Sequence, residues 1–288
     1  MPVVLEALVQ LLSLERIEEN LFRGQAEDLG WGRLYGGHVL GQALSAATQT
    51  VPPDRLVHSL HSYFLRPGSV SRPIVYDVDR IRDGGSFTTR RVVAIQGGKA
   101  IFNLQVSFHK DEPGFMHQDP IPEAPAPESL PSDQERARAY ADRIPEPLRD
   151  RALADRPFEM KIVGPLPSDP LAPAPMPPTK MMWLKTTGAL PDDQGLHRWL
   201  LAYASDYGFV TTALHPHGVS WLTPQMQIAS IDHVMWFHQP FRMDEWLLHV
   251  IESPAAAGSR GVVRGRVFTR DGRLCASTAQ EGLMRRRG

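Results

Sequence analysis

Apolar positions near the start of the chain recur at helical spacing. Four leucines, Leu5, Leu8, Leu11 and Leu12, recur at separations of three and four residues, close to the helical period of 3.6, which predicts an amphipathic helix. Residues 39–47 are small or apolar on every side, and a helix of that kind must be buried. Gly36 and Gly37 lead into this segment. The pattern therefore predicts a surface helix followed by a buried one.

The pattern then changes to the alternation of polar and apolar residues that is typical of strands. Glycine-rich turn signals stand between the alternating runs, at residues 83–85 and 97–98. Because the runs follow one another as hairpins, we expect an antiparallel sheet wrapped around the buried helix. The predicted strands cover residues 56–65, 74–82, 87–96 and 100–108.

The second part of the chain repeats this order, with one strand, a helix over residues 197–214, and further strands. Residues 64–67 correspond to 237–240, and residues 85–86 correspond to 258–259, both at an offset of 173. A shared order of elements over a whole module indicates duplication. The predicted strands of this second module cover residues 181–187, 227–238, 246–252, 261–269 and 274–282.

Proline separates the two modules. Residues 113–178 hold 16 of the 26 prolines, and such density disfavours both helix interiors and central strands. One short helix is predicted inside this connector, because Ser132 stands three residues before Glu135 in a capping-box spacing. The expected organisation is an N-terminal unit over 1–112, a connector over 113–178 and a C-terminal unit over 179–288.

Composition narrows the class of protein. The 288 residues carry 31 Lys plus Arg against 32 Asp plus Glu, so a net charge of -1 gives no reason to expect a nucleic-acid partner. A single cysteine, Cys275, suits a reducing compartment. No apolar stretch approaches the ~20 residues of a membrane span, and no basic region precedes an apolar one at the start. We expect a cytoplasmic protein without a membrane span.

Asp206 departs from the apolar pattern of its segment. On a helix over 197–214 it would share one stripe with Trp199, Tyr203 and Val210. A carboxylate on a core-facing stripe costs roughly several kcal/mol unless it is hydrogen-bonded or used in chemistry. The pattern alone leaves two interpretations open, a structural aspartate and a catalytic one.

Four segments resemble the acyl-CoA thioesterase II family, and the resemblance covers nearly the whole chain. They are residues 21–25, 35–44, 57–68 and 231–238. The resemblance implies an α+β tandem double hotdog fold, in which each unit wraps a long antiparallel sheet around a central helix. It also implies an acyl-CoA substrate, hydrolysis to free fatty acid and CoA, and a homo-oligomer, either a dimer or a tetramer.

The resemblance also implies a catalytic trio of Asp206, Ser230 and Gln280. By pattern alone, a strand serine is most often a small packing residue, and a strand glutamine is most often a solvated one. The family usually has threonine where this chain has Ser230, which keeps the hydroxyl but loses the methyl that fixes its rotamer. In the implied mechanism, Asp206 accepts the proton of a water that Ser230 and Gln280 hold against the thioester carbonyl.

Three further residues are candidates for substrate binding. We hypothesise that Gly36 and Gly37 offer backbone N–H groups to the oxyanion at a helix N-terminus, although tight helix packing explains them equally well. Strand alternation places His58 and His61 on opposite faces, so that one of them could contact ligand; a core or interface histidine is the alternative. The neighbouring Asp232 and His233 point to opposite faces and are not counted as a dyad.

The motifs that the sequence lacks limit the functions that remain possible. The sequence has no Gly-x-Ser-x-Gly elbow, no phosphate-binding loop and no His-Glu-x-x-His, so neither a metal nor another cofactor is expected. A hotdog enoyl-CoA hydratase would need an Asp-His pair that no segment matches. A non-catalytic acyl-CoA-binding protein would need no polar trio. Both stay open at this stage.

Overall fold

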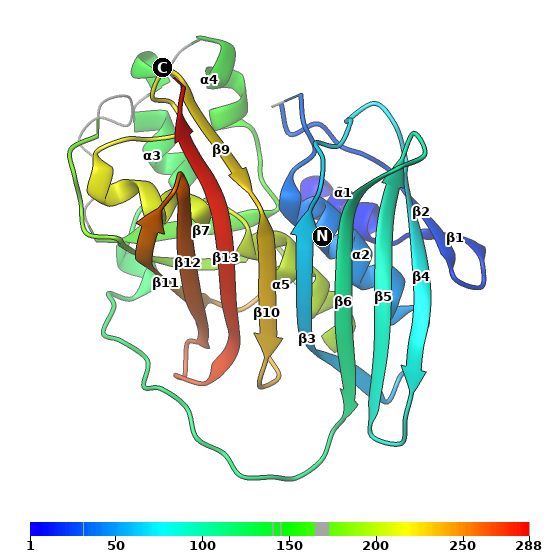
Figure 1. The fold of residues 1–288 in the computed structure, drawn as a ribbon. Coiled ribbons are helices and arrows are strands. Elements are labelled where there is room, and N and C mark those ends of the chain that lie inside the picture. The colour runs from blue at the N-terminus through cyan, green and yellow to red at the C-terminus, as the bar shows by residue number, and fades with distance from the viewer. Residues whose placement is uncertain (31, 140, 145, 165–172, 288) are drawn as a thin grey trace.

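Two buried helices lie side by side on the concave side of one long curved sheet (Figure 1). This computed structural model describes residues 1–30, 32–139, 141–144, 146–164 and 173–287. The two helices are α2 (Gly36–Thr48) and α5 (Gln194–Ser205). They come from the two modules, so the duplicated units meet through their central helices.

Small residues allow these helices to approach closely. In α2, every residue from Gly37 to Ala47 is buried. A Cβ at Gly41 would lie 3.4 Å from the carbonyl oxygen of Trp199 in α5, at the limit of ordinary contact. The start of α5 is fixed by Asp193, whose carboxylate accepts hydrogen bonds from the N–H groups of Gly195 and Leu196.

The strands form one antiparallel sheet that runs through both units. Its order is β1-β2-β4-β5-β6-β3-β10-β13-β12-β11-β8-β7, with β9 paired to β13. The units join where β3 pairs with β10, with His61 opposite Val234. The strands are β1 (Glu15–Glu18), β2 (Leu21–Gly24), β3 (Arg55–Phe64), β4 (Ile74–Asp83), β5 (Phe87–Gln96), β6 (Lys99–Lys110), β7 (Phe158–Val163), β8 (Thr179–Thr186), β9 (Met226–Ser230), β10 (Asp232–Phe237), β11 (Leu247–Ala257), β12 (Arg260–Thr269) and β13 (Leu274–Arg286).

Alternation sets which side of the sheet meets the helices. Thr88, Arg90, Val92 and Ala94 of β5 are buried on the concave side, while the residues between them are more exposed. This fits a sheet with one face on a helical core and one face outward. The expected α+β fold, in which each unit wraps a long antiparallel sheet around a central helix, is confirmed, and the β3–β10 pair joins the two units into one sheet.

The predicted helix over 197–214 was too long. Helix α5 ends at Ser205, Gly208 adopts a left-handed backbone with φ of 59°, and a separate 3-10 helix, η3 (Val210–His217), follows. A continuous apolar stripe cannot reveal such a break, because both helical segments bury their apolar side chains. Asp206 therefore caps the end of α5 and does not lie within a helix.

The predicted strand over 227–238 is two strands. Ile231 lies between β9 and β10, where its carbonyl accepts a hydrogen bond from the N–H of Phe64 and its own N–H donates to the carbonyl of Glu281. Strand β9 pairs with β13, whereas β10 pairs with both β3 and β13. This break at Ile231 leaves Ser230 as the last residue of β9.

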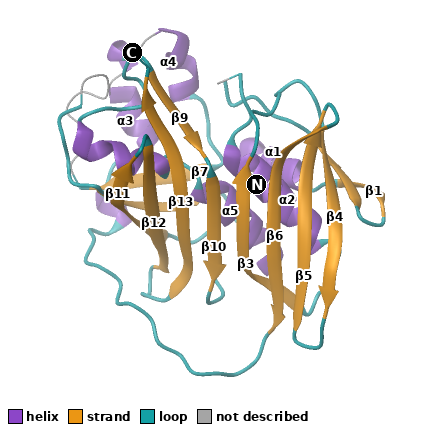
Figure 2. Cartoon of the chain, viewed as in Figure 1, coloured by secondary structure: helices purple, strands orange, loops and turns teal. Residues whose placement is uncertain are grey.

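The proline-rich segment 113–178 is more structured than its composition indicated (Figure 2). The predicted capping box is present at the start of α3 (Asp133–Ala139), since Glu135 accepts from the N–H of Ser132 at 2.7 Å and donates its own N–H to the hydroxyl of Ser132 at 3.1 Å. The segment also contains η1 (Pro127–Ser129), η2 (Ala141–Arg143), α4 (Glu146–Leu153) and β7. Strand β7 was missed because its six residues are too few to show a clear period between flanking prolines.

One more helix packs against the core. Helix α1 (Val3–Leu12) packs Leu5, Leu8 and Leu12 against α2. Among the described residues, no helix is long and apolar enough to cross a membrane.

Candidate active site

Asp206, Ser230 and Gln280 converge where the two units meet. The Nε2 of Gln280 donates to Oδ1 of Asp206 at 2.8 Å. The hydroxyl of Ser230 donates to the same oxygen at 3.3 Å. Asp206 lies at the end of α5, Ser230 at the end of β9 and Gln280 in β13. The structure thus brings together the three residues predicted as catalytic.

Strand register explains why two of these side chains meet. Ser230 lies opposite Gly282 in the β9–β13 pair, and Gln280 is two residues from Gly282 on the same face. A Cβ at Gly282 would lie 1.9 Å from Cγ2 of Val210, so only glycine leaves room for the segment that follows Asp206. The sheet and η3 therefore fix the trio from two directions.

The predicted glycine pair brings the start of α2 against Asp206. The N–H of Gly37 donates to Oδ2 of Asp206 at 3.1 Å. A Cβ at Gly36 would lie 2.6 Å from the same oxygen, and a Cβ at Gly37 would lie 2.1 Å from the carbonyl oxygen of Tyr203. Both glycines are needed for close packing, and the N–H of Gly37 holds the carboxylate.

Two helix ends act on Asp206 with opposite signs. It sits at the C-terminus of α5, where the helix dipole disfavours a negative charge, and at the N-terminus of α2, where the dipole favours one. Burial raises the pKa of Asp206 from 3.8 to about 6, while hydrogen bonds from Gln280, Ser230 and the Gly37 N–H oppose that rise. A carboxyl with a pKa near 6 is ionised at neutral pH and basic enough to take a proton from water.

Aromatic rings enclose one side of this carboxylate. Tyr35 donates its hydroxyl to the carbonyl of Tyr203 at 2.9 Å and stacks on Tyr207 with ring centroids 4.9 Å apart. Burial and the nearby charge of Asp206 both raise the pKa of Tyr35. The phenol stays protonated and excludes water from this side of the site.

Two residues that the sequence did not single out extend the trio, His233 beside Gln280 and Ser205 beside His233. His233 lies with its Nδ1 3.1 Å from Nε2 of Gln280, and its Nε2 is 2.9 Å from the hydroxyl of Ser205. The neighbouring Asp232 instead accepts a backbone N–H from Glu281. Asp232 and His233 do not form a dyad, as alternation predicted. Alternation could not show, however, that the buried member of this pair meets Gln280.

His58 lies apart from the trio. Its Nε2 is 2.8 Å from the hydroxyl of Ser107, and its ring contacts Phe87 and His109. The expectation that His58 and His61 occupy opposite faces was wrong, because a bulge at His58 breaks the alternation and both lie on the outer face. A substrate-binding role for His58 stays a prediction.

The opposite end of the helix pair is built differently. There Asp193 caps the N–H groups of α5 from within its own unit, and the indole N–H of Trp199 donates to the hydroxyl of Thr48 at 3.1 Å. By contrast, α2 has no side-chain cap of its own and receives Asp206 from the other unit. The two ends therefore differ in where the carboxylate comes from, since α5 is capped from its own unit and α2 is capped from the other unit.

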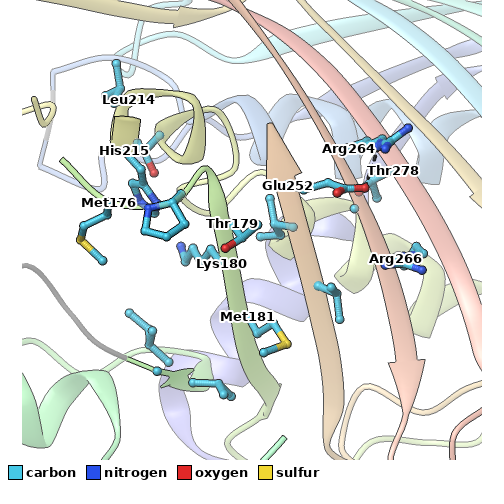
Figure 3. Close-up of a pocket in the computed structure, with 18 of the residues that line it drawn as sticks. Met176, Thr179, Lys180, Met181, Leu214, His215, Glu252, Arg264, Arg266 and Thr278 are labelled. Carbon is cyan, nitrogen blue, oxygen red and sulfur yellow. Dashed lines mark hydrogen bonds and ion pairs between the residues drawn. The ribbon is translucent and has the colours of Figure 1, made fainter. Parts of the chain in front are cut away.

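A cavity of about 1280 Å³ is lined by residues of the C-terminal unit and of the connector (Figure 3). Arg264 and Arg266 line it, and they alternate along β12 with the buried Val263 and Val267 of the concave side. Leu214 of η3 and Thr278 of β13 line it as well, whereas the trio of Asp206, Ser230 and Gln280 does not.

The architecture identifies the fold class of the protein. A conserved protein of unknown function with a hot dog fold from Alicyclobacillus acidocaldarius superposes with a TM-score of 0.76 at 19% identity, covering 98% of this chain and 99% of the other. That likeness shows the fold, and the chain is a tandem hotdog protein.

Sequence comparison then shows the family. The family model described as "Acyl-CoA thioesterase" matches residues 163–283, and the one described as "Acyl-CoA thioesterase N-terminal domain" matches residues 26–109. Acyl-CoA thioesterase 2 of Haemophilus influenzae is 43% identical over 98% of each chain. Acyl-coenzyme A thioesterase 8 of Homo sapiens is 42% identical over 96% of this chain and 88% of its own.

A solved structure supports the same family. The acyl-CoA thioesterase II TesB2 from Mycobacterium marinum has a TM-score of 0.78 and 39% identity, with 98% of this chain and 99% of the other covered. The chain belongs to the acyl-CoA thioesterase family, which confirms the resemblance seen in the sequence.

Proposed function

We propose that this chain is an acyl-CoA thioesterase that hydrolyses fatty acyl-CoA to free fatty acid and CoA. The observation that carries the proposal is the carboxylate of Asp206, held at the junction of the two units by three donors. Its raised pKa, about 6, suits a general base at neutral pH. The relatives' names supply the substrate class, and the site supplies a means of activating water.

In the proposed reaction, Asp206 accepts a proton from water as the water oxygen bonds to the thioester carbon. The resulting tetrahedral intermediate collapses with cleavage of the C–S bond, and the proton passes from Asp206 to the departing thiolate. Ser230 and Gln280 fix the carboxylate by donating to Oδ1. Because a thioester is activated and a thiolate leaves readily, the reaction needs no covalent enzyme intermediate.

The N–H of Gly36 is the donor proposed for the oxyanion. It lies at the first position of α2, where the helix dipole favours negative charge, and it has no hydrogen-bond partner among the described residues. The N–H of Gly37 is already bound to Asp206. The N–H of Gly36 would thus donate to the substrate oxygen, while the N–H of Gly37 donates to the base.

Two other functions were open from the sequence alone, an enoyl-CoA hydratase and a non-catalytic acyl-CoA-binding protein. Membership of the acyl-CoA thioesterase family favours neither. A binder needs no carboxylate whose pKa is raised to about 6 at this junction, whereas a general base does. Conversion of crotonyl-CoA without thiol release would favour the hydratase.

Thiol release from a series of acyl-CoAs of increasing chain length tests the proposed function. We expect turnover with at least part of the series, and a kcat/KM that falls as the pH drops through about 6, where Asp206 becomes protonated. The sign follows from the base role, since only the ionised carboxylate accepts a proton. An acyl-CoA series that yields no thiol, or a rate that rises below pH 6, would contradict the proposal.

We also propose that the enzyme is a cytoplasmic homo-oligomer, either a dimer or a tetramer. A buried free thiol at Cys275, the single cysteine, suits a reducing compartment. Large side chains exposed on the outer face of the sheet, including Tyr63, Phe87 and Trp236, suit contact with a second copy. The molar mass in solution by light scattering tests the assembly.

A further inference from the structure

The imidazole ring of His233 is buried between Gln280, which donates to Asp206, and Ser205 at the end of α5. It is fully buried in β10. Its Nδ1 lies 3.1 Å from Nε2 of Gln280, and its Nε2 lies 2.9 Å from the hydroxyl of Ser205. The ring touches Asp206 only through Gln280, which itself donates to the carboxylate at 2.8 Å.

The directions of these hydrogen bonds are set at the Ser205 end. The hydroxyl of Ser205 has one proton, and the carbonyl of Ala202, 2.9 Å away, can only accept it. The thioether of Met235, at 3.5 Å, is a weaker acceptor for that same proton. Ser205 must therefore accept from Nε2–H of His233. Burial lowers the pKa of His233 to about 3, so the ring is neutral and its Nδ1 carries a lone pair.

This tautomer determines the orientation of the Gln280 side-chain amide. An amide nitrogen has two N–H groups, and here one faces Oδ1 of Asp206 while the other faces Nδ1 of His233. If the amide were turned over, its oxygen would face a carboxylate and a lone pair. In the observed orientation, Oε1 of Gln280 is buried and has no partner among the described residues. A buried acceptor without a partner is costly unless a further donor uses it.

We propose that His233, with its tautomer set by Ser205, is a positioning residue that holds Gln280 with Nε2 on Asp206 and Oε1 free to accept a hydrogen bond from the attacking water. The inference rests on the proposed hydrolysis, for which it supplies the orientation of the water. One O–H of that water would point to Asp206 and the other to Oε1 of Gln280. The oxygen lone pair would then face the thioester carbon.

The proposal predicts a change in pH dependence when the acceptor on His233 is lost. The Gln280 hydrogen bond lowers the pKa of Asp206, so an amide that is free to turn away removes this effect and raises that pKa. The acid limb of the pH profile, the range in which kcat/KM falls as the pH drops, then moves to higher pH. The groups packed around Asp206 are the N–H of Gly37, Ser230, Gln280 and the phenol of Tyr35. Those packed around His233 are Ser205, Phe209, Gln280 and the neutral His249.

Three substitutions of His233 separate positioning from packing. His233→Asn keeps an acceptor near Nδ1, and we expect it to retain most of the turnover. His233→Leu removes the acceptor, and His233→Gln extends toward Ser205 and leaves the Nδ1 position empty. For both we expect a loss of roughly tenfold in kcat/KM, the size of one hydrogen bond, with an acid limb at higher pH. Melting temperatures report any loss of folding separately.

Ser205→Ala supplies a test that leaves the ring in place. Without the hydroxyl, His233 can carry its proton on Nδ1 and donate to Oε1 of Gln280, which turns the amide over. We expect the same upward shift of the acid limb as in His233→Leu. Met235→Leu, which contacts Ser205 without serving as its main acceptor, is the packing control and should keep the wild-type limb.

The outcomes are distinct from those that test the proposed function. If the wild type releases no thiol from acyl-CoA, the function fails and so does this inference. If the wild type is active, a shifted limb in Ser205→Ala together with near-normal turnover in His233→Asn supports positioning. Equal losses in His233→Asn and His233→Leu, with the limb unmoved in all variants, overturn it.

Discussion

Replacing Asp206 with asparagine is expected to lower kcat for thiol release by at least about 100-fold, the usual contribution of a general base. The substitution preserves the shape of the side chain and leaves an oxygen to accept from Gln280 and Ser230. It removes the one group at this junction that can take a proton from water. The measurement is steady-state thiol release at pH 7.5, with KM expected to change far less than kcat.

Asp232→Asn is the matched control for that experiment. Asp232 is also a partly buried aspartate on a strand next to the site, and its carboxylate accepts the backbone N–H of Glu281, which an asparagine oxygen can also do. We expect its turnover to stay close to that of the wild type. An Asp206→Asn variant that keeps its activity would move the role of base to another residue.

Asp206→Asn should also remove a pH dependence of stability. The folded pKa of Asp206 is raised from 3.8 to about 6, so the folded state binds this proton more tightly than the unfolded state does. Stability from this group is full below about pH 4 and declines as the pH rises through 6. The difference between these two pKa values corresponds to roughly 3 kcal/mol in the free energy of unfolding. Denaturant unfolding at pH 4 and pH 7.5 should show this decline in the wild type and its absence in the variant.

Gly37→Ala is expected to destabilise the protein by about 3 kcal/mol and to abolish activity. A Cβ at this position would lie 2.1 Å from the carbonyl oxygen of Tyr203 and 2.6 Å from the ring of Tyr35. Backbone cannot move aside as a flexible side chain can, so α2 must shift away from α5. That shift withdraws the Gly37 N–H from Asp206. The checks are denaturant unfolding and thiol release.

Gly41→Ala in the same helix is the control for Gly37→Ala. Its Cβ would meet Cδ2 of Leu12 at 3.0 Å, the far end of a flexible side chain, and the Trp199 carbonyl at 3.4 Å. Alanine is also a better helix former than glycine by about 1 kcal/mol, which offsets part of the crowding. Similar losses at both positions would show that the close approach at Gly37 has no special role.

Local pattern was sufficient for much of the fold and for one feature of the site. The strand over 87–96 matches β5, and the recurring order of elements matches the two units. Asp206 stood out because a carboxylate interrupted an apolar stripe. The roles given to Ser230 and Gln280 came from family resemblance, since a strand serine and a strand glutamine carry little information by themselves.

The rest depended on contacts between distant parts of the chain. The helix ends at Ser205 because the chain turns at Gly208, and this turn brings Asp206 to the N-terminus of a helix 169 residues away in sequence. His233 meets Gln280 through the register of β10 and β13, which a single strand cannot reveal. The bulge at His58 likewise arises from pairing with β6. Periodicity describes one element at a time, and the site is built between elements.

Single-turnover hydrolysis in water labelled with oxygen-18 tests most directly whether Asp206 activates water or attacks the thioester itself. Direct attack by water predicts that the fatty acid released in the first turnover carries the label, while the peptide containing Asp206 carries none. An unlabelled first product together with label on the Asp206 carboxyl would mean that this residue forms an anhydride with the acyl group, and would contradict its role as a base.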